Sequence, residues 1–273
     1  LYVFIGENSF ALTEEICRWK SQFISKHGAE NLVELSGGDA SEETLLDTIS
    51  TAPFIAERRL VICYGMPKLE RESVRRIALE IHPQTLLLIA DSAPDKRLSS
   101  TKEFINIAEE ASEQHMKTFP LLKRPQLVSW IRTRVTSLRC TIEDAAILHL
   151  LDIVGEDQWF LASEIEKLSL AGPSITSQLI DSLVVPSGEQ LIWKLSDILG
   201  SQKVGEAQKF YRKCIDHGQD PYDLWIALLT FIKNLTAVWI CLQSGVKDAR
   251  LIAENTKIHP FVIPKLLPMA KDA

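Results

Sequence analysis

The chain has 273 residues, of which 46% are apolar and 24% are charged, and its formal net charge is −6. This length suggests two or three soluble domains. The acidic total argues against strong autonomous DNA binding, because a protein that holds DNA by its phosphates normally shows a basic face.

The first 120 residues alternate between short apolar runs and amphipathic stretches. Strands that alternate with helices predict a parallel sheet covered on both faces. The run 84–90 is apolar on both faces, which is typical of a central parallel strand. Ser41 is placed to cap the helix that follows it. The expected strands are 1–5, 31–35, 60–64, 84–90 and 115–119, and the expected helices are 10–27, 41–49, 69–81 and 100–111.

After Pro120 the pattern changes and every segment indicates helix. The segment 186–188, Pro-Ser-Gly, is the expected boundary between two helical domains. In the helix from Gln158, an apolar stripe is expected to contain Trp159 or Phe160 together with Ala162, Ile165 and Leu168. The helix 221–243 carries more apolar surface than one helix stripe needs. The expected helices are 124–138, 142–154, 158–170, 176–184, 188–199, 204–217, 221–243, 247–255 and 260–270.

The cysteines and histidines do not form a recognisable metal or disulfide pattern. The five cysteines are scattered and include no C-x-x-C, so we interpret them as small buried residues in a reducing cytoplasm; they are Cys17, Cys63, Cys140, Cys214 and Cys241. The six histidines lack metal-ligand spacing. No signal peptide is visible and no apolar run reaches about 18 residues, so we expect no membrane span.

The first strand-to-helix turn lies where a nucleotide-binding sheet holds its phosphate loop. Such a loop needs small residues and a lysine that reaches phosphate. Here the turn 6–10 reads Gly-Glu-Asn-Ser-Phe, so Glu7 would repel phosphate and no lysine follows. Asp91 ends the fourth strand, where a working ATPase places a metal-binding acid, but without a phosphate loop we interpret it as a turn-forming residue. We expect no catalytic residue, metal or cofactor.

The connection between the second helix and the third strand contains two large apolar residues. Pro53 cannot continue the preceding helix, and Phe54 and Ile55 follow it. A Phe at such a turn either packs back onto its own sheet or is presented to a partner, and the residues of the connection leave both readings open.

Four basic pairs stand in the first half of the chain. Pairs of this kind are usually solvated surface, and contact with nucleic acid is the alternative. They are Arg58-Arg59, Arg75-Arg76, Lys96-Arg97 and Lys123-Arg124.

The order of these features resembles the delta subunit of bacterial DNA polymerase III, the clamp-loader subunit that opens the sliding clamp. The features are the Gly6-Glu7 turn, the apolar connection before Arg58-Arg59-Leu60-Val61 and the turn 95–97 after the fourth strand. They continue with the helix that contains Glu164-Ile-Glu-Lys-Leu168, Ile175-Thr176 opening the next helix, and 258–262, Ile-His-Pro-Phe-Val, in the tail. Each motif is loose, and the similarity lies in their order along essentially the whole chain.

The resemblance implies α/β plus all-α architecture in three domains. Residues 1–120 would form a degenerate AAA+-like domain with a parallel sheet, 121–186 a small helical lid domain, and 187–273 a helical collar that joins other loader subunits. The collar is short compared with the family, and the chain starts on Leu1 inside a strand. We therefore expect the chain to be trimmed at one or both ends, and the collar to be incomplete.

The resemblance also implies a non-catalytic subunit of a polymerase complex, without ATPase activity. The family contacts the clamp through a hydrophobic pair, typically Leu-Phe, which corresponds here to Pro53-Phe54. Phe54 agrees and Pro53 departs, so either the first contact is lost or Ile55 replaces it. Lys96 and Arg97 are candidate DNA contacts, with primed DNA met only within the complex. The alternative is a non-catalytic scaffold subunit resembling delta prime, whose zinc cysteines and arginine-finger motif are absent.

Overall fold

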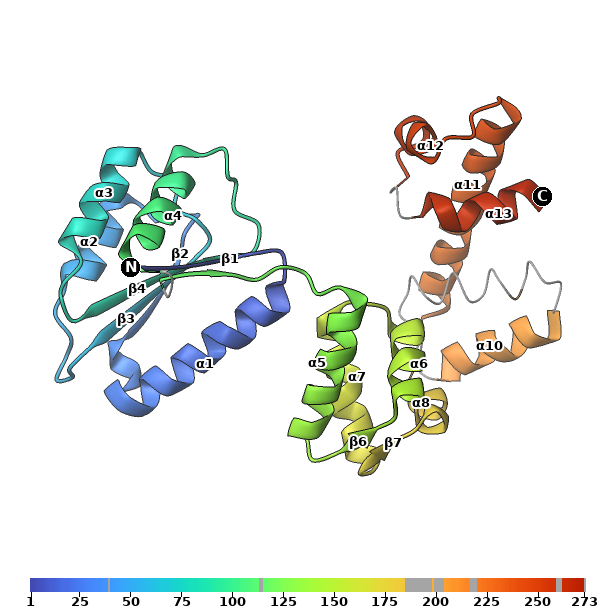
Figure 1. Ribbon diagram of the computed structural model, residues 1–273, viewed down its shortest axis with the longest axis horizontal. Coiled ribbons are helices and arrows are strands. Elements are labelled where there is room, and N and C mark those ends of the chain that lie inside the picture. The colour runs from blue at the N-terminus through green and yellow to red at the C-terminus, as the bar shows by residue number, and fades with distance from the viewer. Residues whose placement is uncertain are drawn as a thin grey trace. The chain divides into compact units, whose positions relative to one another are not determined.

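A computed structural model describes residues 1–38, 40–112, 115–184, 198, 204–216, 220–258 and 262–272. The chain divides into two compact units, Leu1–Lys123 and Arg124–Ala273 (Figure 1). The predicted domain boundary at 186–188 and most of the predicted helix 188–199 lie outside the described residues. The division into domains 1–120, 121–186 and 187–273 therefore stays a prediction.

The first unit is a five-stranded parallel sheet in the order β2-β3-β4-β1-β5, as the alternating pattern predicted. Its strands are β1 Tyr2–Ile5, β2 Leu32–Ser36, β3 Arg59–Tyr64, β4 Thr85–Asp91 and β5 Met116–Thr118. Its helices are α1 Ser9–His27, the short 3-10 helix η1 Ala29–Asn31, α2 Glu42–Ser50, α3 Arg71–Glu80 and α4 Ser99–Ala111. Ser41 caps α2 as predicted, because its hydroxyl accepts a hydrogen bond from the Thr44 backbone.

Helices cover both faces of this sheet, so it has two apolar cores. α1 covers one face, and α2, α3 and α4 cover the other (Figure 1). Alternate residues of each strand enter opposite cores, which explains why the central strand β4 is apolar throughout. Leu87 and Ile89 face the three helices, while Leu88 packs with Ile16 of α1. Each fully buried side chain of this size contributes about 1.5–3 kcal/mol through the removal of apolar surface from water.

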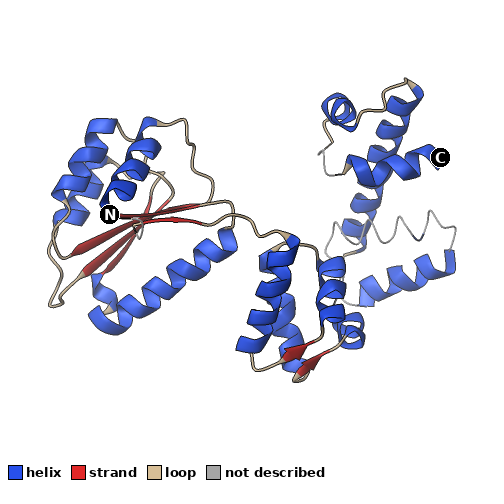
Figure 2. Ribbon diagram, viewed as in Figure 1, coloured by secondary structure: helices blue, strands red, loops and turns tan. Residues whose placement is uncertain are grey.

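The second unit is mostly helical but contains a strand pair that the sequence pattern missed. Its elements are α5 Arg124–Ser137, β6 Thr141–Ile142, α6 Asp144–Val154, α7 Gln158–Ala171, β7 Ser174–Ile175, α8 Ser177–Leu183, α10 Val204–Asp216, α11 Pro221–Gln243, α12 Ala249–Thr256 and α13 Ile263–Asp272. β6 and β7 pair in parallel (Figure 2). The expectation of helix alone after Pro120 is therefore wrong, because two-residue strands are too short to show a period of two.

The apolar stripe of α7 also differs from the prediction. Ala162, Ile165 and Leu168 are buried as expected, but Trp159 and Phe160 are exposed. The Asp157 carboxylate accepts hydrogen bonds from the backbone N–H groups of both aromatic residues and so fixes where the first turn begins. With that start, the buried face of α7 passes through Gln158 and Leu161.

The cysteines divide into two groups. Cys63, Cys140 and Cys214 are buried, as predicted, whereas Cys241 is half-buried and Cys17 is exposed. Cys17 follows the buried Ile16 on α1, and one residue along a helix turns the side chain by about 100° toward solvent. The prediction of buried cysteines is therefore wrong for Cys17.

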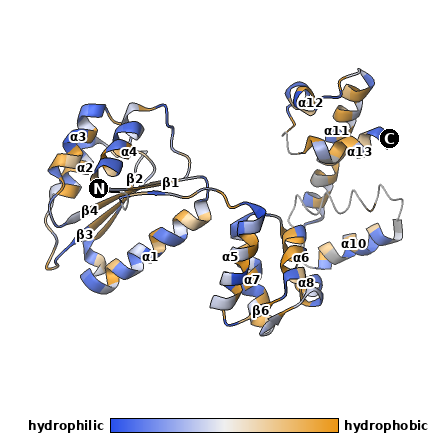
Figure 3. Ribbon diagram, in the orientation of Figure 1, coloured by the Kyte–Doolittle hydropathy of each residue, from blue (hydrophilic) through white to orange (hydrophobic). Residues whose placement is uncertain are grey.

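The longest helix, α11, is apolar along most of its length (Figure 3). Among the described residues it is the one helix long and apolar enough to cross a membrane by length and composition, which is weak evidence because core helices meet the same criterion. Many of its large side chains are exposed. They are Tyr222, Trp225, Ile226, Leu229, Ile232, Trp239 and Ile240.

Candidate functional site

The connection from Thr51 to Arg58 joins α2 to β3 and exposes the two large apolar residues that the sequence singled out. Phe54 is 65% exposed and Ile55 is 91% exposed, while Pro53 is half-buried. Neither Phe54 nor Ile55 belongs to the apolar cores of the first unit. Of the two readings left open by the sequence, the structure therefore favours presentation of Phe54 to solvent.

Side-chain hydrogen bonds and a proline end α2 just before this connection. The hydroxyls of Ser50 and Thr51 donate to the carbonyls of Leu46 and Asp47, at 2.7 and 2.6 Å. Pro53 then removes a backbone donor and disfavours continuation of the helix. The helix thus ends on bonds within its own last turn, and the chain leaves it in an extended conformation at Thr51.

Ile55 has a left-handed backbone, with φ of 50°. This conformation is uncommon outside glycine and is an outlier for a β-branched residue. Such conformations cost about 1–3 kcal/mol and persist only where the surrounding structure imposes them. The strained residue lies next to Phe54, so the connection has a defined backbone conformation at this point.

The buried residue Asn31 holds the backbone of this turn. Its carboxamide oxygen accepts a hydrogen bond from the Phe54 N–H at 2.7 Å, and its amide nitrogen donates to the Phe54 carbonyl at 3.0 Å. The same nitrogen also donates to the carbonyl of His27, the last residue of α1, at 2.8 Å. Asn31 is only 2% exposed. The sequence pattern predicts Asn31 only as the first residue of a strand and gives it no role in the site.

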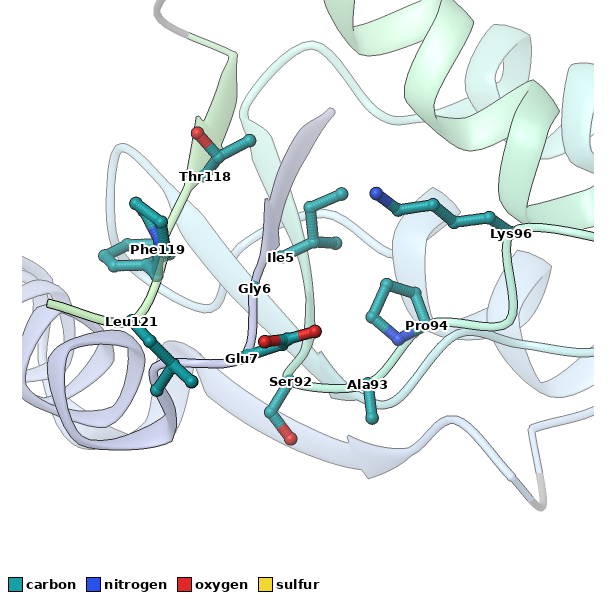
Figure 4. A pocket seen from close by; sticks show the side chains of 11 residues that line it. Ile5, Gly6, Glu7, Ser92, Ala93, Pro94, Lys96, Thr118, Phe119 and Leu121 are labelled. Carbon is teal, nitrogen blue, oxygen red and sulfur yellow. The ribbon is translucent and has the colours of Figure 1, made fainter. Parts of the chain in front are cut away.

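A second candidate site is a cavity of about 520 Å³ in the first unit. It lies at the carboxyl ends of β1, β4 and β5, where open α/β sheets usually bind ligands (Figure 4). Lys96 reaches toward it from the loop after β4, and Glu7 of the turn after β1 also lines it (Figure 4). The lining of the cavity thus combines one acidic and one basic side chain with several apolar residues.

The turn beside this cavity is not built to hold phosphate. The backbone N–H groups of Gly6, Asn8 and Ser9 already donate to the carbonyls of Asp91, Phe119 and Glu7. A phosphate loop leaves such groups pointing at the ligand. The acidic side chain of Glu7 at the same turn would repel phosphate further.

Gly6 is required for a different reason, the close approach of two backbones. A Cβ atom at this position would lie 2.2 Å from the Phe119 carbonyl oxygen. The Asn8 side chain completes the closure, because its amide donates to the Pro120 carbonyl while its oxygen accepts from the Ala11 N–H and caps α1. The turn is therefore sealed against the segment that follows β5.

Asp91 has the turn-forming role that the sequence suggested. Its carboxylate accepts a hydrogen bond from the Met66 N–H at 2.9 Å and another from the Ala93 N–H at 2.8 Å. Both bonds are structural, since the first ties the ends of β3 and β4 together and the second shapes the turn after β4. Across the part of the chain that the structure describes, no cluster of three or more metal-ligating side chains is present.

Lys96 and Arg97, the candidate DNA contacts, have different surroundings. The Arg97 guanidinium binds both carboxylate oxygens of Asp95 at 2.9 Å and lowers the pKa of Asp95 to about 2. Arg97 is therefore partly neutralised within its own turn. Lys96 is exposed and reaches toward the cavity. A DNA contact by either residue stays a prediction.

Another basic pair, Arg75-Arg76, forms ion pairs within the first unit. Arg75 and Arg71 each donate to one oxygen of the buried Glu103, at 2.5 and 2.6 Å, which lowers the pKa of that carboxyl. Arg76 pairs with Glu80 and Glu42. These contacts join α3 to α4 and α2, which supports a surface role for this pair.

The strand order and the helices on both faces define an AAA+-like α/β domain, followed by helical segments. Two family models match the helical part: one described as a middle domain covers residues 125–182, and the model of the DNA polymerase III delta subunit, C-terminal domain, covers residues 189–273. No curated protein sequence matches the chain significantly. Both matches lie within the second unit, so neither of them covers the sheet or the connection that contains Phe54.

Among solved structures, the DNA clamp loader delta protein of Bacillus subtilis is 20% identical, with a TM-score of 0.68, and the match covers 99% of this chain and 83% of that one. The RuvB Holliday junction branch migration motor of Thermotoga maritima (10%, TM-score 0.45, 98% and 78% covered) and a gamma subunit-related protein of DNA polymerase III from the same organism (14%, 0.39, 99% and 92%) are more distant. The C-terminal part of the chain thus matches the delta-subunit family model, and the chain shares its fold with a clamp loader delta protein, as the order of its motifs indicated.

Proposed function

We propose that this chain is the clamp-loader subunit that binds and opens the sliding clamp, with Phe54 as the residue inserted into the clamp. The observation that carries the proposal is the 65% exposure of Phe54 on a connection whose backbone is fixed. Large apolar side chains on shaped surface turns are suited to fill a pocket on a partner. Ile55 stands beside it and replaces the aliphatic residue lost at Pro53.

Opening of the clamp requires no chemistry from this chain. A ligand shifts a conformational equilibrium when it binds one state better than the other. A subunit that binds the open ring more tightly than the closed ring therefore holds it open. ATP bound by partner subunits would control whether Phe54 is accessible. Primed DNA would be met only within the assembled complex, which acts in the cytoplasm.

The exposed apolar side chains of α11 support the collar assignment. Trp225 and Leu229 are 57% and 48% exposed, and they lie one helical turn apart on the same side of α11. Apolar patches of this kind mark protein interfaces. Trp225→Asp together with Leu229→Asp should prevent co-purification with the other loader subunits while clamp binding persists. Normal assembly of this variant would contradict the collar assignment.

The test of the clamp contact is a titration of the sliding clamp with the isolated chain in the absence of nucleotide. Burial of one Phe is worth about 1.5–3 kcal/mol, and interface anchors lose ~2 kcal/mol or more on truncation. Because ~1.4 kcal/mol is one decade in Kd, Phe54→Ala should weaken binding about ten- to a hundredfold. Ile55→Ala tests the contribution of the neighbouring residue.

The matched control is Leu79→Ala, since Leu79 on α3 is also strongly exposed, at 85%. This variant should bind the clamp as wild type does. Phe54→Ala should keep the wild-type melting temperature, because an exposed side chain contributes little to its own core. Wild-type affinity of Phe54→Ala, or unfolding of that variant, would contradict the proposal.

A further inference from the structure

The carboxamide of Asn31 meets Phe54 in a pattern that pairs two backbones in a sheet. In an antiparallel hydrogen-bonded pair, two facing residues exchange both N–H to carbonyl bonds. Asn31 reproduces this exchange with a side chain, since it accepts from the Phe54 N–H and donates to the Phe54 carbonyl. One residue of an exposed connection is therefore fixed at both of its backbone polar groups.

Asn31 is itself held firmly, which makes it an anchor. It is the last residue of η1, directly before β2, and its amide also donates to the carbonyl that ends α1. With 2% exposure, it is shielded from competing water. The anchor thus transfers the rigidity of α1 and the sheet to a connection 23 residues further along the chain.

The strained turn at Ile55 follows directly from this anchor. Once the N–H and carbonyl of Phe54 are both fixed, the next residue must make the turn toward Ala56 and β3. Ile55 does so with a φ of 50°, a conformation that is held only when its surroundings impose it. The turn exposes Phe54 and Ile55 side by side.

We infer that Asn31 is the positioning residue for the Phe54 contact: it pre-organises the turn, so that clamp binding does not have to order it. Ordering a loop on binding reduces affinity, and a loop already fixed in its bound shape avoids that cost. This inference rests on the proposed clamp contact. According to this inference, the buried Asn31 raises the affinity for the clamp without contacting the clamp itself.

Asn31→Asp is the variant that separates the two bonds. A carboxylate of the same shape still accepts from the Phe54 N–H, but it cannot donate and would face the carbonyl oxygens of Phe54 and His27. Asn8→Ala is the matched control, because Asn8 is equally buried, at 3% exposed, and bonds to backbone in the same unit without touching the Phe54 connection.

The experiment is a double-mutant cycle on the full chain, with clamp affinity and melting temperature measured for each variant. In the wild-type background, Asn31→Asp should weaken clamp binding about five- to tenfold, as expected for the loss of the buried hydrogen bond to the Phe54 carbonyl, the one of the two lost bonds that reaches the connection. In the Phe54→Ala background the same change should alter affinity less than about twofold, since coupled residues are not additive. Asn8→Ala should lower the melting temperature and leave affinity unchanged.

Three results would overturn the inference alone: wild-type affinity of Asn31→Asp, an equal loss with and without Phe54, or a comparable loss in Asn8→Ala. Wild-type affinity of Phe54→Ala would instead overturn the proposed function and this inference with it. Hydrogen exchange of the unmodified protein supplies a test that needs no variant. The Phe54 amide should exchange much more slowly than an open loop amide, and fast exchange would contradict the anchor.

Discussion

At each end of α1 a buried asparagine side chain holds a neighbouring segment by hydrogen bonds, but the two ends differ in what they expose. At the start, buried Asn8 caps the helix and bonds to the Pro120 carbonyl; at the end, buried Asn31 bonds to the last carbonyl of the helix and to Phe54. At the start, Phe119 packs inward and is only 7% exposed, while Pro120, which Asn8 bonds, and Leu121 after it are exposed. The segment held at the end places Phe54 outward. The buried amide of Asn8 thus closes the turn at one edge of the sheet, and that of Asn31 holds an exposed connection at the other.

The two edges of the sheet also differ in the kind of ligand that they could bind. The start of α1 is where a phosphate would bind in a sheet of this order, and here the N–H groups of Gly6, Asn8 and Ser9 donate to carbonyls. The apolar connection at the other end carries the proposed contact with a protein. One edge of the sheet therefore has bonded N–H groups, and the opposite edge exposes Phe54 and Ile55.

The largest effect expected is that of Gly6→Ala, which would break the sealed edge. The new Cβ would lie 2.2 Å from the Phe119 carbonyl oxygen, on a backbone with φ of 144°. We expect the free energy of unfolding to fall by ~3 kcal/mol or more, as in other severe steric changes. Chemical denaturation measures it.

Gly65→Ala is the matched control for this change. Gly65 also has a positive φ, of 91°, but a Cβ there would meet no atom within 4 Å. It should cost only the backbone strain, about 1–2 kcal/mol. Equal losses for Gly6→Ala and Gly65→Ala would show that the close approach to Phe119 does not matter.

A smaller effect is expected at the presented edge, where Ile55→Gly should stabilise the protein. Glycine accepts a positive φ without the Cβ clash, so the strain at Ile55 is released, and the free energy of unfolding should rise by about 1 kcal/mol. Ile55→Ala removes most of the same side chain but keeps the strain. Thermal or chemical unfolding compares the two, and a Gly variant no more stable than the Ala variant would argue against strain in this turn.

The smallest effect is expected from ATP, which should give no saturable heat with the isolated chain in calorimetry at micromolar concentrations. The reason is the sealed turn, which contains Glu7 and in which the N–H groups of Gly6, Asn8 and Ser9 are already bonded. The cavity bordered by Glu7 and Lys96 would then not bind ATP. Saturable binding would contradict the view that this edge is closed to nucleotide.

Much of the fold could be predicted because its apolar residues alternate in simple periods. Strands such as 84–90 are apolar throughout and their helices show a clear stripe, so the parallel sheet and most helix bounds agree with the structure. The pair β6–β7 could not be predicted, since two residues hold no period. Gly6 was expected in a turn, but its contact with Phe119 joins segments more than a hundred residues apart and leaves no local pattern.

The candidate site was predicted only in part, for the same reason. Pro53, Phe54 and Ile55 stand out because large apolar residues are unusual in a short connection, and the structure exposes the last two. Asn31 has no such signal. A polar residue at an element boundary is ordinary, and its partner lies 23 positions away. The one available clue was an asparagine just before a strand that begins with apolar residues.

The measurement that tests the central claim most directly is site-specific photocrosslinking between this chain and the sliding clamp. Phe54 would be replaced by p-benzoylphenylalanine, and Leu79, which is also exposed, would be replaced in a second sample as the control. We expect a crosslink to the clamp from position 54, without nucleotide, and none from position 79. No crosslink from position 54 under conditions where the two proteins bind, or equal crosslinks from both positions, would contradict the assignment of Phe54 as the residue presented to the clamp.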